Sequence, residues 1–141
     1  MGEPDLVFDP FPNEAVTRFV SESLVGVNFV RTGHSDWHPM NVLLYSPRKE
    51  VLGGLLGYNW GGWLHVNFLW VTETLRGQGQ GSRLIDAAEA MARERGAIGA
   101  TVETFSFQAP EFYRKRGYMV CGQIDDYPPG HTKFILRKDL V

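Results

Sequence analysis

The amino-acid sequence predicts an α/β (α+β) fold in one domain, residues 1–141, with a mixed and mostly antiparallel sheet. Three strand patterns separated by short turns follow one another between residues 41 and 71, as in an antiparallel meander. A glycine-rich loop and an amphipathic helix then lead to another strand near residue 100, and such a crossover indicates parallel pairing. Two further strand patterns near the end complete the expected sheet.

The first 40 residues predict a short strand, a helix and a loop. Residues 6–8 are an apolar triplet, which Pro10 separates from the next element. Residues 13–24 repeat apolar side chains at helical spacing, at Val16, Phe19, Val20 and Leu24. Residues 25–39 favour a loop, because they include Gly33, Asp36 and Pro39.

The later elements follow from turn residues and from a change of period. The meander is expected to comprise strands 41–45, 51–58 and 63–71, with turns at 46–50 and 59–62. The next helix begins near Ser82 and ends near Gly96, with an apolar face made of Leu84, Ile85, Ala88, Met91 and Ala92. Its solvent-facing side chains are expected to be Asp86, Glu89, Arg93 and Glu94. Strand 100–105, helix 110–117 and strands 118–124 and 133–137 complete the prediction.

Composition restricts the classes of function. A net charge of −2 gives no general attraction to nucleic acid or to an anionic membrane. Cys121 is the only cysteine, and the histidines lack the spacing of metal ligands, so neither a disulfide nor a metal site is expected. No apolar run reaches the length of a membrane span, and the N-terminal residues lack the apolar core of a signal peptide. We therefore expect a cytoplasmic protein that binds neither nucleic acid nor membrane.

The most informative segment is Arg76-Gly77-Gln78-Gly79-Gln80-Gly81, between a strand and a helix. Its glycines release the backbone from side-chain sterics, and N–H groups at a helix N-terminus attract phosphate. Arg76 adds a full positive charge. The glycine spacing differs from the dinucleotide-binding pattern, and no lysine followed by serine or threonine closes the loop. The loop is either a tight turn or a site for a nucleotide cofactor other than NAD or ATP.

A second segment, residues 106–118, combines aromatic and basic side chains. Pro110 suits the first turn of a short helix, on which Phe112 and Tyr113 point about 100° apart. One ring can therefore face the core while the other faces a cleft. Three basic residues follow, Arg114, Lys115 and Arg116. Taken alone, the segment also fits a solvated helix with an aromatic pair in the core.

Together, the two segments resemble the GNAT superfamily of N-acetyltransferases. The acetyl-CoA motif of that family is Arg or Gln, two residues, Gly, one residue, and Gly or Ala, and it is matched by Arg76, Gly79 and Gly81. The family's later motif has an alanine four residues before a tyrosine, then a glycine and an aromatic residue. It is matched by Ala109, Tyr113, Gly117 and Tyr118. The resemblance covers about residues 51–140, and two matched motifs in one context are more specific than either alone.

The resemblance implies a twisted sheet splayed open between its fourth and fifth strands, residues 63–71 and 100–105, with helices on both faces. It also implies acetyl-CoA as the co-substrate, with its pyrophosphate on the amides of residues 78–82 and its pantetheine along the edge of residues 69–71. The expected cofactor contacts are Leu69, Trp70, Val71, Arg76, Gly77, Gln78, Gly79, Gln80, Gly81, Ser82, Ser106, Gln108, Tyr113 and Lys115. Ser106 stands where many relatives have asparagine, and Gln108 is a candidate to compensate.

The implied reaction is attack of an amine on a thioester, and it needs an acid, a base and an oxyanion donor. A backbone N–H near Leu69 or Trp70 is the expected oxyanion donor. The resemblance implies that Tyr113 is the general acid, because a phenol with a pKa of about 10 holds its proton at neutral pH. Many relatives have a glutamate base on the fourth strand, which has no carboxylate here. His65, expected on the same face as Leu69, and Glu103 are the alternative candidates.

The acceptor is expected to be a primary amine of a small molecule, with a peptide or protein amine as the alternative. Residues 29–39 and 125–131 carry carboxylates beside aromatic rings, which would suit a cationic amine if these segments are more than polar surface loops. Two readings without turnover stay open: a CoA-binding sensor, and a partner-binding domain that uses Trp37, Trp60 and Trp63. A homodimer is also possible.

Overall fold

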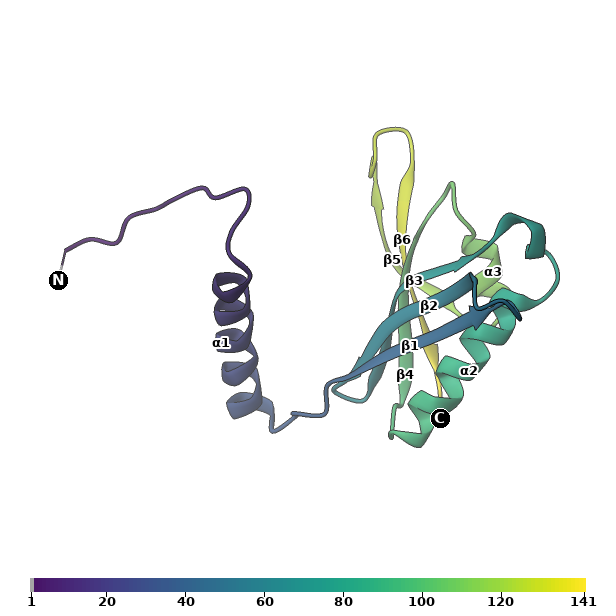
Figure 1. The fold of residues 1–141 in the computed structure, drawn as a ribbon, viewed down its shortest axis with the longest axis horizontal. Coiled ribbons are helices and arrows are strands. Elements are labelled where there is room, and N and C mark those ends of the chain that lie inside the picture. The colour runs from purple at the N-terminus through teal and green to yellow at the C-terminus, as the bar shows by residue number, and fades with distance from the viewer. Residues whose placement is uncertain (1) are drawn as a thin grey trace. The chain divides into compact units, whose positions relative to one another are not determined.

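The computed structural model describes residues 2–141, which divide into two compact units, residues up to Ser35 and residues 36–141 (Figure 1). Each unit is described by itself. The first contains one helix, and the second contains a six-stranded sheet with two further α-helices. The prediction of a single domain over residues 1–141 stays a prediction.

The first unit contains helix α1 (Glu14–Thr32). The Asn13 side chain caps the start of the helix by accepting a hydrogen bond from the Ala15 N–H at 2.8 Å. The helix ends at Gly33, whose φ of 72° is the left-handed conformation of a C-cap. The predicted end near residue 24 is therefore wrong, since the true stop signal is Gly33. The strand predicted at residues 6–8 is also wrong, because those residues form no ladder in the described chain.

The second unit confirms the meander and the C-terminal strand pair. Its strands are β1 (His38–Tyr45), β2 (Val51–Trp60), β3 (Trp63–Val71), β4 (Gly99–Phe105), β5 (Met119–Asp125) and β6 (Thr132–Asp139). They lie in the order β1-β2-β3-β4-β6-β5, and every neighbouring pair is antiparallel except β3 and β4. Gly61 and Gly62 form the two-residue turn between β2 and β3, and both have positive φ, as a tight hairpin requires.

The parallel pair β3–β4 is short, and this opens the sheet. The ladder joins Trp63 through Val66 to Gly99 through Val102 and then stops. Both strands continue beyond the ladder, to Val71 and to Phe105. The predicted splay between these two strands is therefore confirmed, and it leaves the ends of both strands unpaired with each other.

Helix α2 (Gln80–Glu94) covers one face of strands β1 to β3 (Figure 1). Its apolar face is buried at Leu84, Ile85, Ala88 and Ala92. Across from it, Leu55 and Leu64 have no exposed surface, so the core lies between the helix and this face of the sheet. A 3-10 turn, η1 (Glu73–Leu75), precedes α2, and a short helix, α3 (Pro110–Lys115), follows β4.

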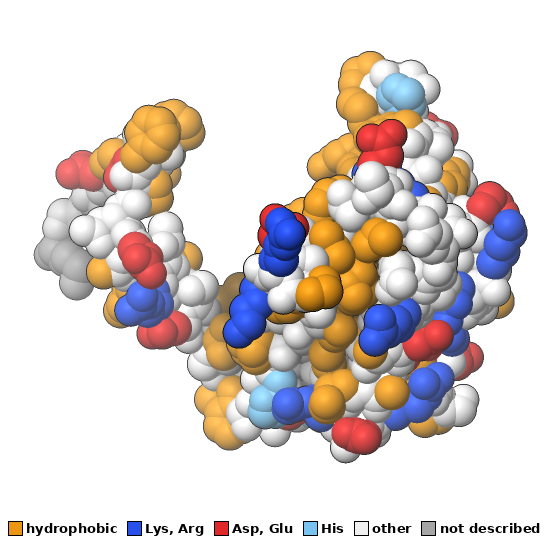
Figure 2. Space-filling view, turned by 45° about the vertical axis from the view of Figure 1, so that its right-hand side comes forward, with side chains coloured by type: hydrophobic (Ala, Val, Ile, Leu, Met, Phe, Trp, Pro, Cys, Tyr) orange, Lys and Arg blue, Asp and Glu red, His pale blue; other side chains and the backbone are white. Residues whose placement is uncertain are grey.

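The face of the second unit drawn in Figure 2 carries both signs of charge. Figure 2 shows a band of hydrophobic side chains with Lys, Arg, Asp and Glu side chains scattered on either side of it. On the face shown, the basic side chains are interspersed with acidic ones rather than gathered together. No helix among residues 2–141 is long and apolar enough to cross a membrane.

A β-bulge at Asn67 changes which side chains face α2. Gly57 pairs with Val66 and Leu56 pairs with Phe68, so Asn67 is the extra residue on β3. A Cβ at Gly57 would lie 2.1 Å from the His65 carbonyl oxygen, which explains the glycine at this crowded position.

After the bulge, each β3 side chain points to the face of the sheet opposite to the one that strict alternation would give. Leu69 lies opposite the buried Leu55 and therefore on the α2 face, whereas His65 lies opposite Tyr58 on the other face. The prediction that His65 shares a face with Leu69 is wrong, because a strict period of two cannot reveal a bulge.

Candidate active site

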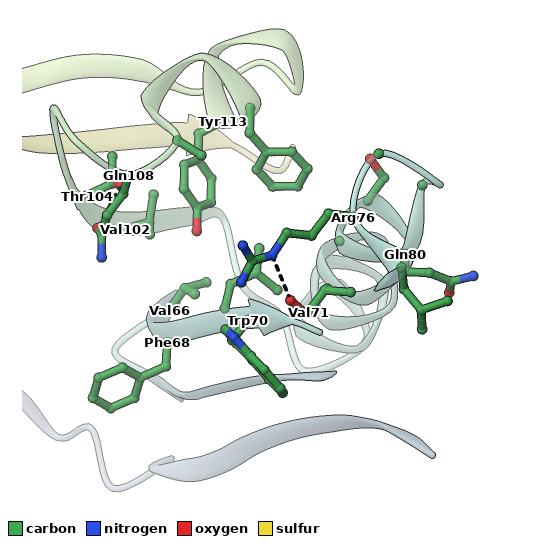
Figure 3. Close-up of a pocket in the computed structure, with 18 of the residues that line it drawn as sticks. Val66, Phe68, Trp70, Val71, Arg76, Gln80, Val102, Thr104, Gln108 and Tyr113 are labelled. Atoms are coloured by element: carbon green, nitrogen blue, oxygen red, sulfur yellow. Dashed lines mark hydrogen bonds between the residues drawn. The ribbon is translucent and has the colours of Figure 1, made fainter. Parts of the chain in front are cut away.

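A cleft of about 940 Å³ lies where β3 and β4 separate (Figure 3). It is lined by residues 66–71, 75–77, 79–82, 102–104, 107–109, 112 and 113. These residues come from the ends of two strands, from the glycine-rich loop with the start of α2, and from the segment that leads into α3. The two segments singled out in the sequence therefore border one cleft.

The glycine-rich loop has the backbone that an anion site needs. Gly77 and Gly79 have φ values of 74° and 81°, which residues with a Cβ rarely adopt. A Cβ at either position would meet no atom within 4 Å, so the space beside the loop is open. Gly79 is the N-cap of α2, and no side chain caps the first turn. The N–H groups of this turn are thus available to a ligand, and the helix dipole favours an anion there.

Arg76 ties the loop to the end of β3. Its Nε donates a hydrogen bond to the Val71 carbonyl oxygen at 3.1 Å, and the guanidinium reaches into the cleft (Figure 3). The neighbouring Gln78 turns its side chain to the Thr74 carbonyl oxygen, at 2.9 Å, and does not line the cleft. Arg76 is therefore the basic side chain of the loop that lines the cleft.

Tyr113 lines the cleft from α3. Only 7 % of the residue is exposed, and its hydroxyl points into the cleft (Figure 3). Phe112 and Tyr118 pack edge-on against its ring, with centroids at 5.1 and 5.7 Å. Burial raises the pKa of Tyr113 to about 12, so the hydroxyl keeps its proton at neutral pH.

Gln108 lines the cleft, whereas Ser106 does not. The Gln108 Oε1 accepts hydrogen bonds from the Thr104 hydroxyl at 3.2 Å and from the Phe105 N–H at 3.1 Å. Ser106 instead holds the start of β6: its N–H donates to the Thr132 carbonyl oxygen, and its hydroxyl oxygen accepts from the Thr132 N–H. The exposed Lys115 also lies outside the cleft lining.

The two candidate bases lie in different places. Glu103 is part of the cleft wall, and its carboxylate pairs with the Lys133 ammonium at 2.8 Å. His65 is outside the lining, with its ring against Tyr58 at a centroid distance of 5.1 Å. The structure therefore brings Glu103, but not His65, into the same cleft as Tyr113.

Sequence reasoning missed several lining residues and one buried charge. Phe107 and Thr104 line the cleft, although only their position beside the second motif pointed to them. Glu89, predicted to face solvent, is 2 % exposed, so that prediction is wrong. Its carboxylate accepts hydrogen bonds from the Tyr118 hydroxyl at 2.9 Å and from the Lys138 Nζ at 2.6 Å, and a single-helix pattern cannot show such partners.

Residues 2–141 contain no group of three or more His, Cys, Asp or Glu side chains that could hold a metal ion.

Comparisons with known proteins agree with this geometry. The sequence matches the model of the Acetyltransferase (GNAT) family over residues 10–118. It is 54% identical over 94 residues to the blasticidin-S acetyltransferase of Streptomyces morookaense, which covers 66% of this chain and 69% of that protein. It is 34% identical to an acetyltransferase of Agrobacterium fabrum, with 84% of this chain and 87% of that one covered.

Among solved structures, a crystal structure from Agrobacterium tumefaciens assigned as an acetyltransferase is 31% identical, with a TM-score of 0.90. The likeness covers 96% of this chain and 99% of that one. The chain therefore belongs to the GNAT family and is an N-acetyltransferase.

Proposed function

We propose that this protein transfers the acetyl group of acetyl-CoA to a primary amine of a small molecule. The observation that carries the proposal is the single cleft that joins the glycine-rich loop, the open edge of β3 and the Tyr113 hydroxyl. Each of these parts suits one portion of the co-substrate or one step of acyl transfer.

The phosphates of acetyl-CoA would lie at the start of α2. Gln80, Gly81 and Ser82 line the cleft, and their N–H groups belong to the uncapped first turn. The helix dipole and the Arg76 guanidinium both favour negative charge at this point. The open space beside Gly79 supports this placement, because a phosphate must approach the backbone closely there.

The amide-bearing arm of acetyl-CoA would pair with β3 beyond the bulge. Residues 69–71 pair with β2 on one side, whereas their ladder with β4 has already ended at Val66. Apart from the Val71 carbonyl oxygen, which accepts a hydrogen bond from Arg76, the backbone groups that point toward the gap could bind an extended ligand as an added strand. One of these N–H groups, near Leu69 or Trp70, would also stabilise the negative charge that forms on the carbonyl oxygen.

Tyr113 would donate a proton to the departing sulfur. Its hydroxyl points into the cleft, and its raised pKa keeps it protonated at neutral pH, so that a proton is present where the thiolate would form. The attacking amine must in turn lose a proton. Of the two candidates for that role, only Glu103 lies on the cleft wall.

The similarity to a blasticidin-S acetyltransferase supports a small-molecule acceptor. The test is a screen in which the purified chain, acetyl-CoA and single amines are incubated and the products are identified by mass spectrometry. Blasticidin S, polyamines, amino acids and a peptide N-terminus would cover the alternatives. We expect an acetylated small molecule, and acetylation of the peptide alone would overturn the assignment of the acceptor.

Turnover can be distinguished from binding of CoA alone. Thioester cleavage in the presence of a good acceptor distinguishes the two, because a sensor would bind acetyl-CoA and leave it intact with every amine. The buried tyrosine at the cleft favours the enzyme, since a sensor has no need of a proton donor there.

A further inference from the structure

The Lys133 ammonium is enclosed by a carboxylate and two aromatic rings. It lies 2.8 Å from the Glu103 carboxylate, 4.8 Å from the centre of the Tyr127 ring and 6.0 Å from the centre of the Phe105 ring. The two rings are themselves stacked, with centroids 5.8 Å apart. A carboxylate beside aromatic faces is the arrangement that recognises an organic cation.

The Lys133 side chain is mostly buried. Only 17 % of its side chain is exposed, compared with 44 % for its partner Glu103. The hydrogen bond with Glu103 raises the pKa of Lys133, so the group is a cation at physiological pH. The site is thus filled by a charge from the protein itself.

Glu103 is the member of this cluster that lines the cleft. Val102 and Thr104 are buried, and alternation along β4 places the intervening Glu103 on the opposite face of the sheet. All three residues line the cleft, so the cleft passes through the gap between the strands from one face to the other. The start of α2, where the phosphates would bind, borders one opening of the cleft. Glu103 borders the other opening, which is left for the acceptor.

The aromatic wall is continuous with the cleft. Phe107 lines the cleft and stacks on Phe105 with centroids 5.2 Å apart. His131 packs edge-on against Phe107 at 4.9 Å, and the Ser106–Thr132 hydrogen bonds fasten this corner to the start of β6. The rings are therefore held in place, while the lysine has a flexible stem that can swing away.

We propose that Glu103, Tyr127 and Phe105 form a subsite for a cationic group of the acceptor, and that Lys133 occupies this subsite in the free enzyme. The inference rests on the proposed function and names its substrate class: amines that carry a further cationic group, such as a guanidinium. Binding exchanges the Lys133 ammonium for the ligand's cation. Glu103 would then form an ion pair with that cationic group of the acceptor.

The test uses methylguanidinium as the probe and methylurea as its uncharged counterpart of similar shape. Each is titrated by NMR into the full chain saturated with CoA, for wild type, Lys133→Met and Glu103→Gln. A charge-matched control is Arg48→Met, in the turn between β1 and β2. The expected result is that Lys133→Met binds methylguanidinium at least about threefold more tightly, because a competing charge at a cation–π site is gone.

The same titrations have expected results for the other two variants. Glu103→Gln should abolish the preference for methylguanidinium over methylurea, and Arg48→Met should behave as wild type. Three results would overturn the subsite: no binding of methylguanidinium to Lys133→Met, weaker binding to that variant, or parallel changes for the charged and uncharged probes. Failure of the chain to bind CoA in these samples would instead count against the proposed function.

Discussion

The Arg76 Nε donates a hydrogen bond to the Val71 carbonyl oxygen at 3.1 Å and thereby joins the glycine-rich loop to the end of β3. The bond connects the two segments that would bind adjoining portions of acetyl-CoA, its pyrophosphate and its amide-bearing arm. In the proposed complex, the phosphates would bind the N–H groups that follow Gly79, and the amide-bearing arm would pair with the edge of β3 that ends near Val71. Because the Arg76 side chain couples these segments, a substitution in the loop tests the proposed binding site that both segments would form.

The first prediction concerns Gly79. Gly79→Val places a side chain in the open space beside the N-terminus of α2, where a phosphate would lie. We expect CoA affinity to fall at least tenfold, or about 1.4 kcal/mol, in isothermal titration. Gly96→Val is the matched control, because Gly96 follows the same helix and has a similar φ of 83°. Equal affinity losses in both variants would assign the effect to backbone strain instead of a blocked site.

The second prediction concerns the chemical role of Tyr113. Tyr113→Phe keeps the ring and its packing but removes the proton donor, so kcat should fall by about 10²- to 10⁴-fold while CoA affinity changes little. Tyr45→Phe, at an exposed position on β1, is the control and should leave kcat unchanged. Turnover at the wild-type rate by folded Tyr113→Phe, with chemistry shown to limit the rate, would exclude the role.

The third prediction is a dependence of stability on alkaline pH. The pKa of Tyr113 is about 10 in an unfolded chain and is raised by burial to about 12 in the fold. The folded state therefore favours the protonated phenol, and its contribution is complete below pH 10 and is lost as the pH rises through 12.

Urea unfolding at pH 9 and near pH 12 tests whether the free energy of unfolding falls as the pH rises. The free energy of unfolding of wild type should fall by about 2 to 3 kcal/mol more than that of Tyr113→Phe over this range. Identical slopes for the two proteins would show that the Tyr113 hydroxyl is not desolvated by the fold.

The fourth prediction concerns the buried Glu89. Glu89→Gln leaves the largely buried Lys138 ammonium without its anionic partner, and unfolding should become easier by about 2 to 4 kcal/mol. Glu94→Gln changes the same charge at an exposed position of the same helix and should cost less than about 0.5 kcal/mol. Denaturant unfolding of both variants gives the comparison, and equal stabilities would contradict the buried ion pair.

Much of the second unit could be predicted from local sequence signals. Strand β3 was predicted with its observed bounds, because the glycines of the preceding turn and of the following loop delimit it. The two segments that line the cleft also carry their own chemistry, in glycine spacing and in a tyrosine beside a proline-started helix. Such signals depend on local backbone conformation, so they can be recognised without knowledge of the tertiary fold.

The remaining features depend on pairing across the fold. The bulge at Asn67 exists only in the register between β2 and β3, so His65 was placed on the wrong face. Glu89 lies at a polar position of a helical pattern, and its partners Tyr118 and Lys138 come from later segments. The extension of α1 to Thr32 was missed because its stop signal, Gly33, was interpreted as part of a longer loop.

The central claim is that acetyl-CoA bound at the glycine-rich loop gives its acetyl group to an amine. The most direct measurement follows a label in the acetyl group of acetyl-CoA, with blasticidin S as the acceptor and mass spectrometry as the readout. Wild type and Gly96→Val should place the label on a nitrogen of the acceptor, whereas Gly79→Val should transfer little at the same acetyl-CoA concentration. Label that stays on acetyl-CoA with wild type, for blasticidin S and for every other amine of the screen, would contradict the claim.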